Sequence, residues 1–593
     1  MDNPHKMIYQ TLKGDEIRLL TLVPGLRATK IRCSLEVDSL DRVGAYEGLS
    51  YTWGLERSDV DISLDNHSMP VTRNLYEALE ALRLTAQPRK LWVDALCINQ
   101  ADLDERASQV SIMRRIYKEA SKVIVWLGPQ ADNSDLALDL FQKLSGIRQK
   151  HFDFAPYGII TLENLPKAGL PGFEEPAWAA VNSLLERSWF SRVWVIQEVA
   201  VSKESSIRCG DGEIAWEVLA NALRAAHEAQ LMTLLGEGYN HVIRLQAFRE
   251  QIAAGSELPL AHLLVSAHNC LATDARDKIF ALLGLGSDTR LVGDVAASLV
   301  TPSYEKPVAQ VFTEFVRTCF DHYGFLDILS SKVFEGATDG LPSWVPDWSK
   351  HQPCTPLMIH GNPSNYSASK GSRAECSYGA DGRLLHIRGT IVDEVAHVGS
   401  VLFEPEPDQK IDDASIFYEW ACLAEQIRSY PGGAGVDTAF MLTMIANTDV
   451  TAQPASGDHL AASLSWYRWI HMAKLLDIPE YLSLQISQEE DNARATLFHS
   501  AVMRVCYGRR YFLTKNGYMG IGPSSMKTGH LVCIAKGASV PLILDETRTF
   551  VGGHSLEPLR VCKETRFVGE SYVHGLLDGE GYDEGRLEEI CLS

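Results

Sequence analysis

The stretch LWVDALCINQADLDERASQV, residues 91–110, gathers several side chains that could do chemistry. Asp94 follows an apolar run, so it stands at the end of a predicted strand. There an Asp side chain caps a turn by accepting backbone N–H bonds, which is the favoured role, or lines a binding pocket. Cys97 has no His or basic neighbour in the sequence that would lower its pKa, which predicts a buried structural thiol and not a nucleophile. Asn99 and Gln100 are expected to fix the loop.

Acidic residues follow directly, at the start of the predicted helix DLDERASQVSIMRRIYKEAS. Asp102, Asp104 and Glu105 lie in its first turn, where the positive end of the helix dipole favours negative charge. Dipole complementation or surface pairing therefore explains Glu105 without any catalytic role.

A second group of candidates lies further along the chain, in RSWFSRVWVIQEV. Trp194 and Glu198 are spaced i, i+4, so on a helix they share one face. An aromatic ring beside a carboxylate offers a stacking surface and a negative charge, and such a carboxylate can stabilise positive charge that develops on a sugar ring. The structural alternatives are a surface Glu198 paired with Arg192 or Lys203, and a Trp194 that belongs to the core.

Other motifs carry less chemistry. His574 and Asp578, in YVHGLLDGE, are too few for a metal site, so packing in a β unit or a contact between domains is expected. GYMGIGP, near residue 520, indicates a turn-rich hairpin, because the strand–helix setting of a dinucleotide loop is missing. The twelve cysteines are scattered, with no CxxC pair and no Cys/His cluster at zinc spacing, so no metal is expected.

The bulk properties set limits on the class of protein. A chain of 593 residues is expected to form roughly three or four domains. Its formal net charge of -21 lacks the positive surface that nucleic acid or anionic lipid requires. No segment approaches the roughly 20 apolar residues of a membrane span, and the N-terminus has no signal-peptide core. These features, with the scattered cysteines, predict a reduced protein of the cytoplasm.

The elements that position the candidates alternate between strand and helix. Predicted strands at YEGLSYTWG, KLWVDALCI and KVIVWLGP are separated by predicted helices, which favours a parallel sheet with flanking helices, that is, an α/β fold at the N-terminal end. A mainly helical region and a small antiparallel β unit are expected to follow. The predicted domains are 1–210 (the α/β domain), 211–350 (mainly helical), 351–505 (mixed strand and helix) and 506–593 (β-rich).

Three blocks in this order, YEGLSYTWG, LWVDALCINQADLDERASQVSIMRRIYKEASKVIVWLG and RSWFSRVWVIQEV, resemble the fungal heterokaryon incompatibility (HET) domain over about residues 46–200. Further downstream, CLATDARDKIFALLGL, LPSWVPDWS and VGESYVHGLLDGE resemble the trailing region of the subgroup named after heterokaryon incompatibility protein six. Two positions depart from the usual pattern, Gly48 where Ala is commoner and Val93 where Ile is commoner, and neither affects chemistry.

The same blocks are similar to the Toll/interleukin-1 receptor (TIR) fold, whose first strand ends in Ser-Tyr or Ser-Phe. In TIR domains that cleave NAD, a glutamate shortly after a Trp is catalytic, and Glu198 matches it in this sequence. The resemblance implies that Ser50, Tyr51, Asp94 and Trp194 contribute to binding. It also implies that the loop from Ser50 to Glu56 lines the pocket at the carboxyl ends of the strands.

The HET resemblance implies a role in non-self recognition and programmed cell death after fusion of unlike hyphae. It also implies self-association through the HET domain and an allelic or non-self protein partner. The TIR similarity implies NAD as a substrate, and no cofactor is expected. Two alternatives stay open: a non-catalytic scaffold that acts by homotypic assembly, and a HET-like protein recruited to a secondary-metabolite gene cluster. The sequence contains no P-loop, WD or ankyrin repeat that would indicate a sensor. A second expectation is that the part after about residue 210 inhibits the N-terminal domain.

Overall fold

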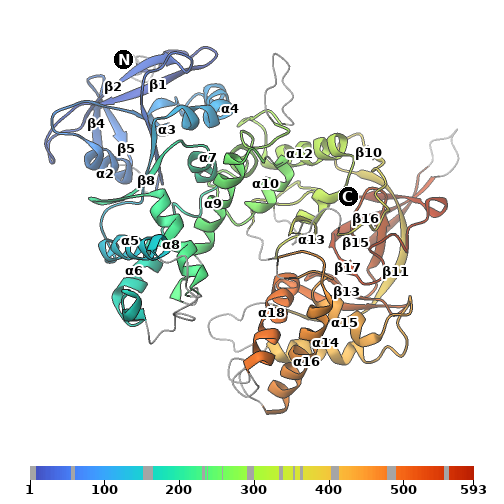
Figure 1. Ribbon diagram of the computed structural model, residues 1–593. Helices are drawn as coiled ribbons and strands as arrows, with labels where there is room; N and C mark the ends of the chain where they lie inside the picture. The colour runs from blue at the N-terminus through green and yellow to red at the C-terminus, as the bar shows by residue number, and fades with distance from the viewer. Residues whose placement is uncertain are drawn as a thin grey trace. The chain divides into compact units, whose positions relative to one another are not determined.

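The chain forms two compact units, Met1–Lys306 and Pro307–Ser593, which are described separately (Figure 1). The computed structural model describes residues 8–54, 60–150, 165–229, 231, 234–236, 238–256, 258–289, 300–332, 338–350, 354–360, 365–402, 413–449, 451–476, 489–552 and 560–593.

The first unit is built on a nine-stranded sheet in the order β5-β4-β2-β1-β6-β3-β7-β8-β9. Its four central strands run parallel, as predicted: β6 (Arg89–Trp92), β3 (Glu47–Tyr51), β7 (Lys122–Trp126) and β8 (Ser205–Cys209). In β3 and β7 every residue after the first is buried, and in β8 four of the five residues are buried, as expected for strands covered on both faces.

The flanks of this sheet differ from the predicted parallel arrangement. Antiparallel pairs join β1 (Glu16–Leu22) to both β6 and β2 (Arg32–Ser39), β4 (Val60–Leu64) to β5 (His67–Val71), and β8 to β9 (Gly212–Ala215). The β4–β5 hairpin shows why. Its turn residues Asp65 and Asn66 both have positive φ, the conformation of a tight two-residue turn that returns the chain antiparallel.

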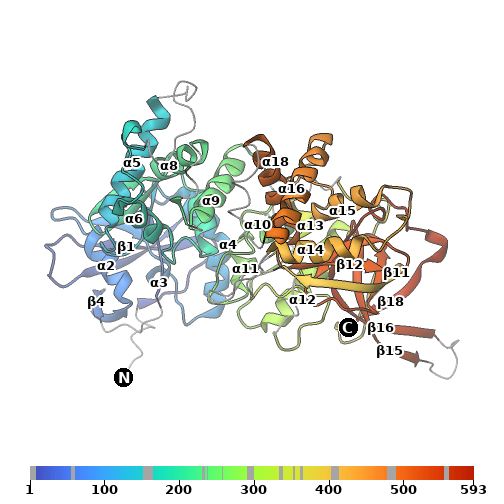
Figure 2. The same cartoon turned by 90° about the horizontal axis from the view of Figure 1, so that it is seen from below.

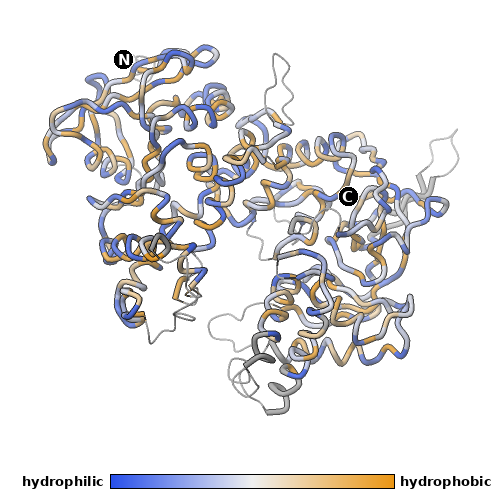
Figure 3. Tube along the Cα trace, viewed as in Figure 1, coloured by the Kyte–Doolittle hydropathy of each residue, from blue (hydrophilic) through white to orange (hydrophobic). Residues whose placement is uncertain are grey.

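Helices of the first unit pack their apolar faces onto this framework. α2 (Arg73–Leu82) begins where the Thr72 hydroxyl accepts the Leu75 N–H, and α4 (Leu103–Glu119) begins where the Asp102 carboxylate accepts two N–H groups. Hydrophobic and hydrophilic residues are interspersed along the helices, as expected for helices with one buried face (Figure 3). The other helices are α3 (Asp94–Cys97), α5 (Ser134–Lys150), η1 (Leu165–Ala168), α6 (Pro176–Leu185), α7 (Trp194–Ala200), α8 (Trp216–Glu228), α9 (Gly238–Ala253), α10 (Leu260–Ser266) and α11 (Asp277–Phe280). Among them α5, α6 and α8 gather in one group (Figure 2).

The second unit contains a β-barrel. Strands β11 (Leu385–Val401), β14 (Leu531–Ala535), β15 (Leu542–Gly552), β16 (Arg560–Glu570) and β18 (Glu588–Leu592) close a ring, because β11 pairs with both β14 and β18. The predicted β unit at 506–593 therefore takes one long strand from the middle of the chain, and its β16–β18 pair is parallel where an antiparallel unit was predicted. The sheet continues through β12 (Arg509–Thr514), β13 (Met519–Pro523) and β17 (Tyr572–Val573), and β10 (Cys376–Tyr378) pairs with β11.

Helices complete the second unit. α14 (Asp413–Ala424), α15 (Val436–Met444), α16 (Gly457–Leu476) and α18 (Glu489–Cys506) share one hydrophobic core with β12 and β13. Shorter or more N-terminal helical segments are α12 (Val308–Tyr323), η3 (Asp327–Ser331), α13 (Leu357–His360) and η4 (Glu584–Arg586). Within the described part of the chain, no helix combines the length and the apolar character that crossing a bilayer demands.

Candidate functional site

Ser50 and Glu198, which lie 148 residues apart, meet at the carboxyl end of the parallel strands. The Ser50 hydroxyl at the end of β3 donates a hydrogen bond to Oε2 of Glu198 on α7. The Trp189 indole N–H donates to the same Ser50 oxygen at 2.8 Å. Ser50 is 1% exposed and Glu198 is 2% exposed, so the carboxyl group is enclosed by protein.

The topology places this pair at a switch point of the sheet. The chain leaves β3 toward the β6 side of the sheet and leaves β7 toward the β8 side. In open α/β sheets, ligands bind outside the carboxyl ends of strands that diverge in this way. The location of the pair therefore matches the location of a binding site in sheets of this kind.

Burial controls the charge of Glu198. It raises the pKa of the carboxyl group to about 7, and the nearby Asp94 carboxylate acts in the same direction. The positive charge of Arg192 and the hydrogen bond from Ser50 oppose the rise. The group therefore changes its charge close to neutral pH, a property that is common among acid–base and electrostatic groups in active sites.

Tyr51 and Asp94 form a second contact beside the first. Asp94 follows β6 and opens the short helix α3, and its carboxylate hydrogen-bonds the Tyr51 hydroxyl. Its Oδ1 accepts the Ala95 N–H at 2.7 Å, and its Oδ2 accepts the Trp53 indole N–H at 2.8 Å. Burial raises the pKa of Asp94, although the side chain keeps partial exposure. Asp94 thus accepts a backbone N–H, as the capping role predicts, and also contacts the predicted site residue Tyr51.

Arg192 acts on both the Ser50–Glu198 contact and the Tyr51–Asp94 contact. Its guanidinium donates to the Tyr51 carbonyl, and its charge lowers the pKa of both Glu198 and Asp94. The sequence suggested Arg192 only as a surface partner of Glu198. Trp53 and Arg192 could have been found from the sequence, because both lie inside the motif blocks, in the runs YTWG and FSRVW.

The structure does not bring Trp194 into this group by any contact among the described residues. Its indole N–H donates to Asp277 of α11 at 3.1 Å. Asp277 also accepts the Tyr304 hydroxyl at 2.7 Å, and the Arg106 guanidinium stacks on the Tyr304 ring at 3.6 Å from its centre. The charged motif ATDARDK was the sequence signal for this cluster, which ties α4 and α7 to the segment beyond residue 270.

The loop of the opening stretch is structural, as predicted for three of its residues. Cys97 is buried, its sulfur accepts the Val93 N–H, and burial raises its pKa to about 12, so it is no nucleophile. Gln100 donates to the Asp94 carbonyl at 3.0 Å, and the Asn99 side chain accepts the Ala101 N–H at 3.3 Å. The predicted binding loop lies only partly in view, because residues 55–59, which include Glu56, fall outside the described residues.

Two C-terminal predictions are also confirmed. GYMGIGP supplies part of the turn and all of β13 in the hairpin that β13 forms with β12. His574 packs within the β unit: its Nδ1 lies 3.1 Å from the Tyr572 hydroxyl, and burial lowers its pKa.

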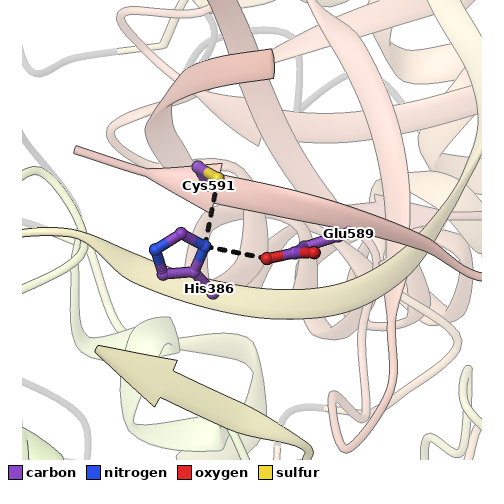
Figure 4. A group of neighbouring side chains, drawn as sticks. All are labelled: His386, Glu589 and Cys591. Atoms are coloured by element: carbon purple, nitrogen blue, oxygen red, sulfur yellow. Dashed lines mark hydrogen bonds and ion pairs between the residues drawn. The ribbon is translucent and has the colours of Figure 1, made fainter. Parts of the chain in front are cut away.

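A group with potential metal ligands lies on the barrel, where the sequence indicated none. His386 pairs in register with Cys591 across β11 and β18, and its Nδ1 lies 3.2 Å from Sγ of Cys591 and 3.1 Å from Glu589 Oε1 (Figure 4). Cys591 is disulfide-bonded, so it offers no thiolate to a metal in this state. The long separation of residues 386 and 591 hides the group in the sequence.

Comparison with known proteins agrees with the motif order. The sequence model of the Heterokaryon incompatibility protein (HET) family matches residues 46–198, and that of the Het-6 beta-barrel domain matches residues 465–592. The chain is similar to the protein "Heterokaryon incompatibility protein 6, OR allele" of Neurospora crassa, with 24% identity over 97% of this chain and 96% of that protein. No solved structure matches. With the HET match in the first unit and the barrel match in the second, both units of this chain are similar to heterokaryon incompatibility proteins.

Proposed function

We propose that this protein acts in fungal non-self recognition by hydrolysing NAD in its HET domain, and that loss of NAD from the cytoplasm leads to cell death. The observation that carries the proposal is the buried Ser50–Glu198 pair at the carboxyl end of the parallel sheet. The similar Neurospora protein is named for incompatibility, which supports the biological half of the proposal. The order of β3, β6, β7 and α7 along the chain is the order that the resemblance to TIR domains implied, and it supports the chemical half.

The chemistry asks for one carboxylate. When the bond between ribose and nicotinamide breaks, nicotinamide departs as a neutral molecule and the ribose carbon becomes positive. An ionised Glu198 stabilises that charge. Water then adds to the ribose carbon and releases one proton, so the products are ADP-ribose, nicotinamide and a proton. Ser50 holds the carboxylate in place through its hydrogen bond.

The enclosure of Glu198 gives the proposal a second part. At 2% exposure Glu198 is out of reach of a substrate in the state described, and its partner Ser50 is also hydrogen-bonded to Trp189. We assign this state to the resting protein. Self-association of HET domains, triggered by an allelic or non-self partner, is the step that opens access to Glu198.

The same enclosure favours a second candidate function, a scaffold that signals by homotypic assembly without catalysis. A glutamate that is buried and hydrogen-bonded can serve only to fasten α7 to β3. The two functions differ in one measurable property, the consumption of NAD.

The test measures nicotinamide release by the purified full-length protein over a wide range of protein concentrations. Wild type should release nicotinamide increasingly per molecule as concentration rises. Glu198→Gln, which keeps the shape of the side chain, should release none. Glu204→Gln, an exposed acid near the same helix, serves as the matched control and should behave as wild type. If wild type and Glu198→Gln are equally inactive at every concentration while both assemble in light scattering, the protein is a scaffold.

A further inference from the structure

Three partly exposed side chains surround the carboxyl ends of β3 and β6, outside the buried Ser50–Glu198 pair. Trp53 lies two residues after β3, Asp94 lies two residues after β6, and Arg192 lies two residues before α7. Trp53 is 39% exposed, which is unusual for an indole, and Asp94 and Arg192 are both partly exposed. The bond-breaking step proposed for Glu198 involves none of the three side chains, so it does not explain why they lie together at this edge of the sheet.

The protein holds these side chains in fixed places. The Trp53 indole N–H is bonded to Asp94, and the neighbouring Thr52 carbonyl accepts the Asn74 amide at 2.6 Å. Asn74 is held in turn by the Trp126 indole at 2.9 Å. The chain at Arg192 is fastened by the Val193 N–H, which donates to the Leu271 carbonyl at 2.9 Å. An exposed indole that is held by its N–H presents its ring with little loss of freedom on binding.

Asp94 and Arg192 can form more hydrogen bonds than their contacts among the described residues use. An ionised carboxylate has about four acceptor sites, and Asp94 uses three of them, for Trp53, Ala95 and Tyr51. A guanidinium has five N–H donors, and the hydrogen bond of Arg192 goes to the Tyr51 carbonyl. The Asp94 carboxylate, next to the Tyr51 hydroxyl, and the Arg192 guanidinium, next to the Tyr51 carbonyl, can therefore accept and donate further hydrogen bonds, and the Trp53 ring lies beside Asp94.

This combination matches the three parts of one class of ligand. Every nucleobase has a π-face that stacks on an indole. Ribose hydroxyls donate to carboxylates, and phosphate oxygens accept from guanidinium groups in a paired geometry. A ligand with an aromatic base, a ribose and a phosphate satisfies all three side chains, whereas a nucleoside leaves Arg192 without a phosphate and an inorganic anion leaves Trp53 and Asp94 without a partner.

We propose that Trp53, Asp94 and Arg192 form a binding subsite for a ribonucleoside 5′-phosphate, with the base on Trp53, the ribose hydroxyls on Asp94 and the phosphate on Arg192. In the cell the ligand is one nucleotide half of NAD, and this assignment rests on the proposed function. The subsite lies at the protein surface, so it accepts a nucleotide in the resting state, before Glu198 becomes accessible.

The test titrates the full-length protein by calorimetry with AMP, adenosine and ribose 5-phosphate, none of which contains the nicotinamide–ribose bond that the protein is proposed to break. AMP should bind more tightly than the other two. Trp53→Ala should weaken AMP binding by about tenfold or more, whereas Trp53→Phe keeps a ring and should retain most of it. Arg192→Lys should lower the affinity for AMP toward the affinity for adenosine. Asp94→Asn should reduce the preference for AMP over its 2′,3′-dideoxy analogue.

A matched control separates these effects from general damage. Lys203→Ala removes a cation that pairs with Glu119 on the surface and should leave AMP binding unchanged. The subsite is refuted if AMP does not bind, or if Trp53→Ala binds AMP as the parent does with an unchanged melting temperature. AMP binding without NAD consumption by wild type refutes the enzyme and keeps the subsite. NAD consumption that is unaffected by Trp53→Ala, Asp94→Asn and Arg192→Lys keeps the enzyme and refutes the subsite.

Discussion

The guanidinium of Arg18 lies 2.5 Å from the carboxylate of Glu105, in an ion pair that is almost completely enclosed, with side chains 1% and 9% exposed. Arg18 also donates to the Cys97 carbonyl at 3.0 Å, and Glu105 accepts the Asn99 N–H at 2.7 Å. Glu105 lies in the first turn of α4, as dipole complementation predicts, but the alternative prediction of surface pairing is wrong. The reason is that β1, which the sequence did not reveal, passes beneath the start of α4 and supplies the partner.

Replacing one member of this pair should destabilise the first unit strongly. Glu105→Gln leaves the Arg18 charge buried without a counter-charge, which costs about 3–5 kcal/mol in comparable cases. The urea midpoint of the full chain, followed by tryptophan fluorescence, should fall. The double variant Arg18→Met/Glu105→Leu should recover part of the loss, because it removes both charges. A double variant less stable than either single one would contradict this account.

Stability should depend on pH through Glu198. Its pKa is raised from 4.5 to about 7 in the folded protein. The folded state therefore keeps a proton that the unfolded chain releases, so the free energy of unfolding should fall as pH rises from about 4.5 to about 7. The contribution of this group is at most about 3 kcal/mol. Urea midpoints measured across this interval should decline less in Glu198→Gln, which has no proton to lose.

The activity, if Glu198 acts as proposed, should show the opposite trend with pH. The ionised carboxylate is the active form, so nicotinamide release should rise with pH. Its midpoint should be no higher than about 7, because opening of the site removes part of the burial that raises the pKa of Glu198. The exposed control Glu204→Gln should keep both the stability profile and the activity profile of wild type. An activity that is constant from about pH 4 to about pH 9 would exclude Glu198 as the titrating group.

Local patterns in the sequence predicted local structure well. DLDERAS predicted the start of α4, where the structure shows Asp102 as the cap, and the apolar runs predicted β3, β6 and β7. That Ser50 and Glu198 lie close together could be predicted only from the family resemblance, because no sequence periodicity relates residues so far apart.

Contacts between distant segments could not be predicted. Trp194 was expected beside Glu198 from its i, i+4 spacing, yet its N–H reaches Asp277, 83 residues away. The barrel shows the same limit. It closes through β11, whose pairing with β14 and β18 depends on register across more than a hundred residues of intervening chain. Helical spacing tells which face a residue occupies, whereas the partner of that face is decided by tertiary packing.

The extent of the first unit changes the choice of fragment for the autoinhibition test. A chain cut after residue 210 loses Asp277, the partner of Trp194, and Arg249, which donates to the Val199 carbonyl at 2.8 Å. It also loses the Leu271 carbonyl that holds Val193. All three contacts fasten α7 or the residue before it. We therefore expect fragment 1–210 to be unfolded by circular dichroism and fragment 1–306 to be folded.

Fragment 1–306 then tests autoinhibition properly. If the second unit inhibits the first, this fragment should release more nicotinamide, or kill more cells on expression, than the full chain. A folded fragment with activity no greater than that of the full chain would end the idea. Full-length Asp277→Ala provides the control for the contact itself and should lower the urea midpoint without abolishing folding.

Ser50 should tune the proton affinity of Glu198. Its hydrogen bond favours the ionised carboxylate and so lowers the pKa of Glu198 against the effect of burial. Ser50→Ala removes that bond and also leaves the Trp189 indole N–H without its acceptor, at a cost of about 1–3 kcal/mol in stability. A titration of the Glu198 carboxyl carbon by NMR should then show a pKa higher than in wild type, and the pH midpoint of nicotinamide release should move upward with it. Ser111→Ala, on an exposed face of α4, should change neither midpoint. An unchanged Glu198 pKa in folded Ser50→Ala would mean that burial alone sets the charge of this group.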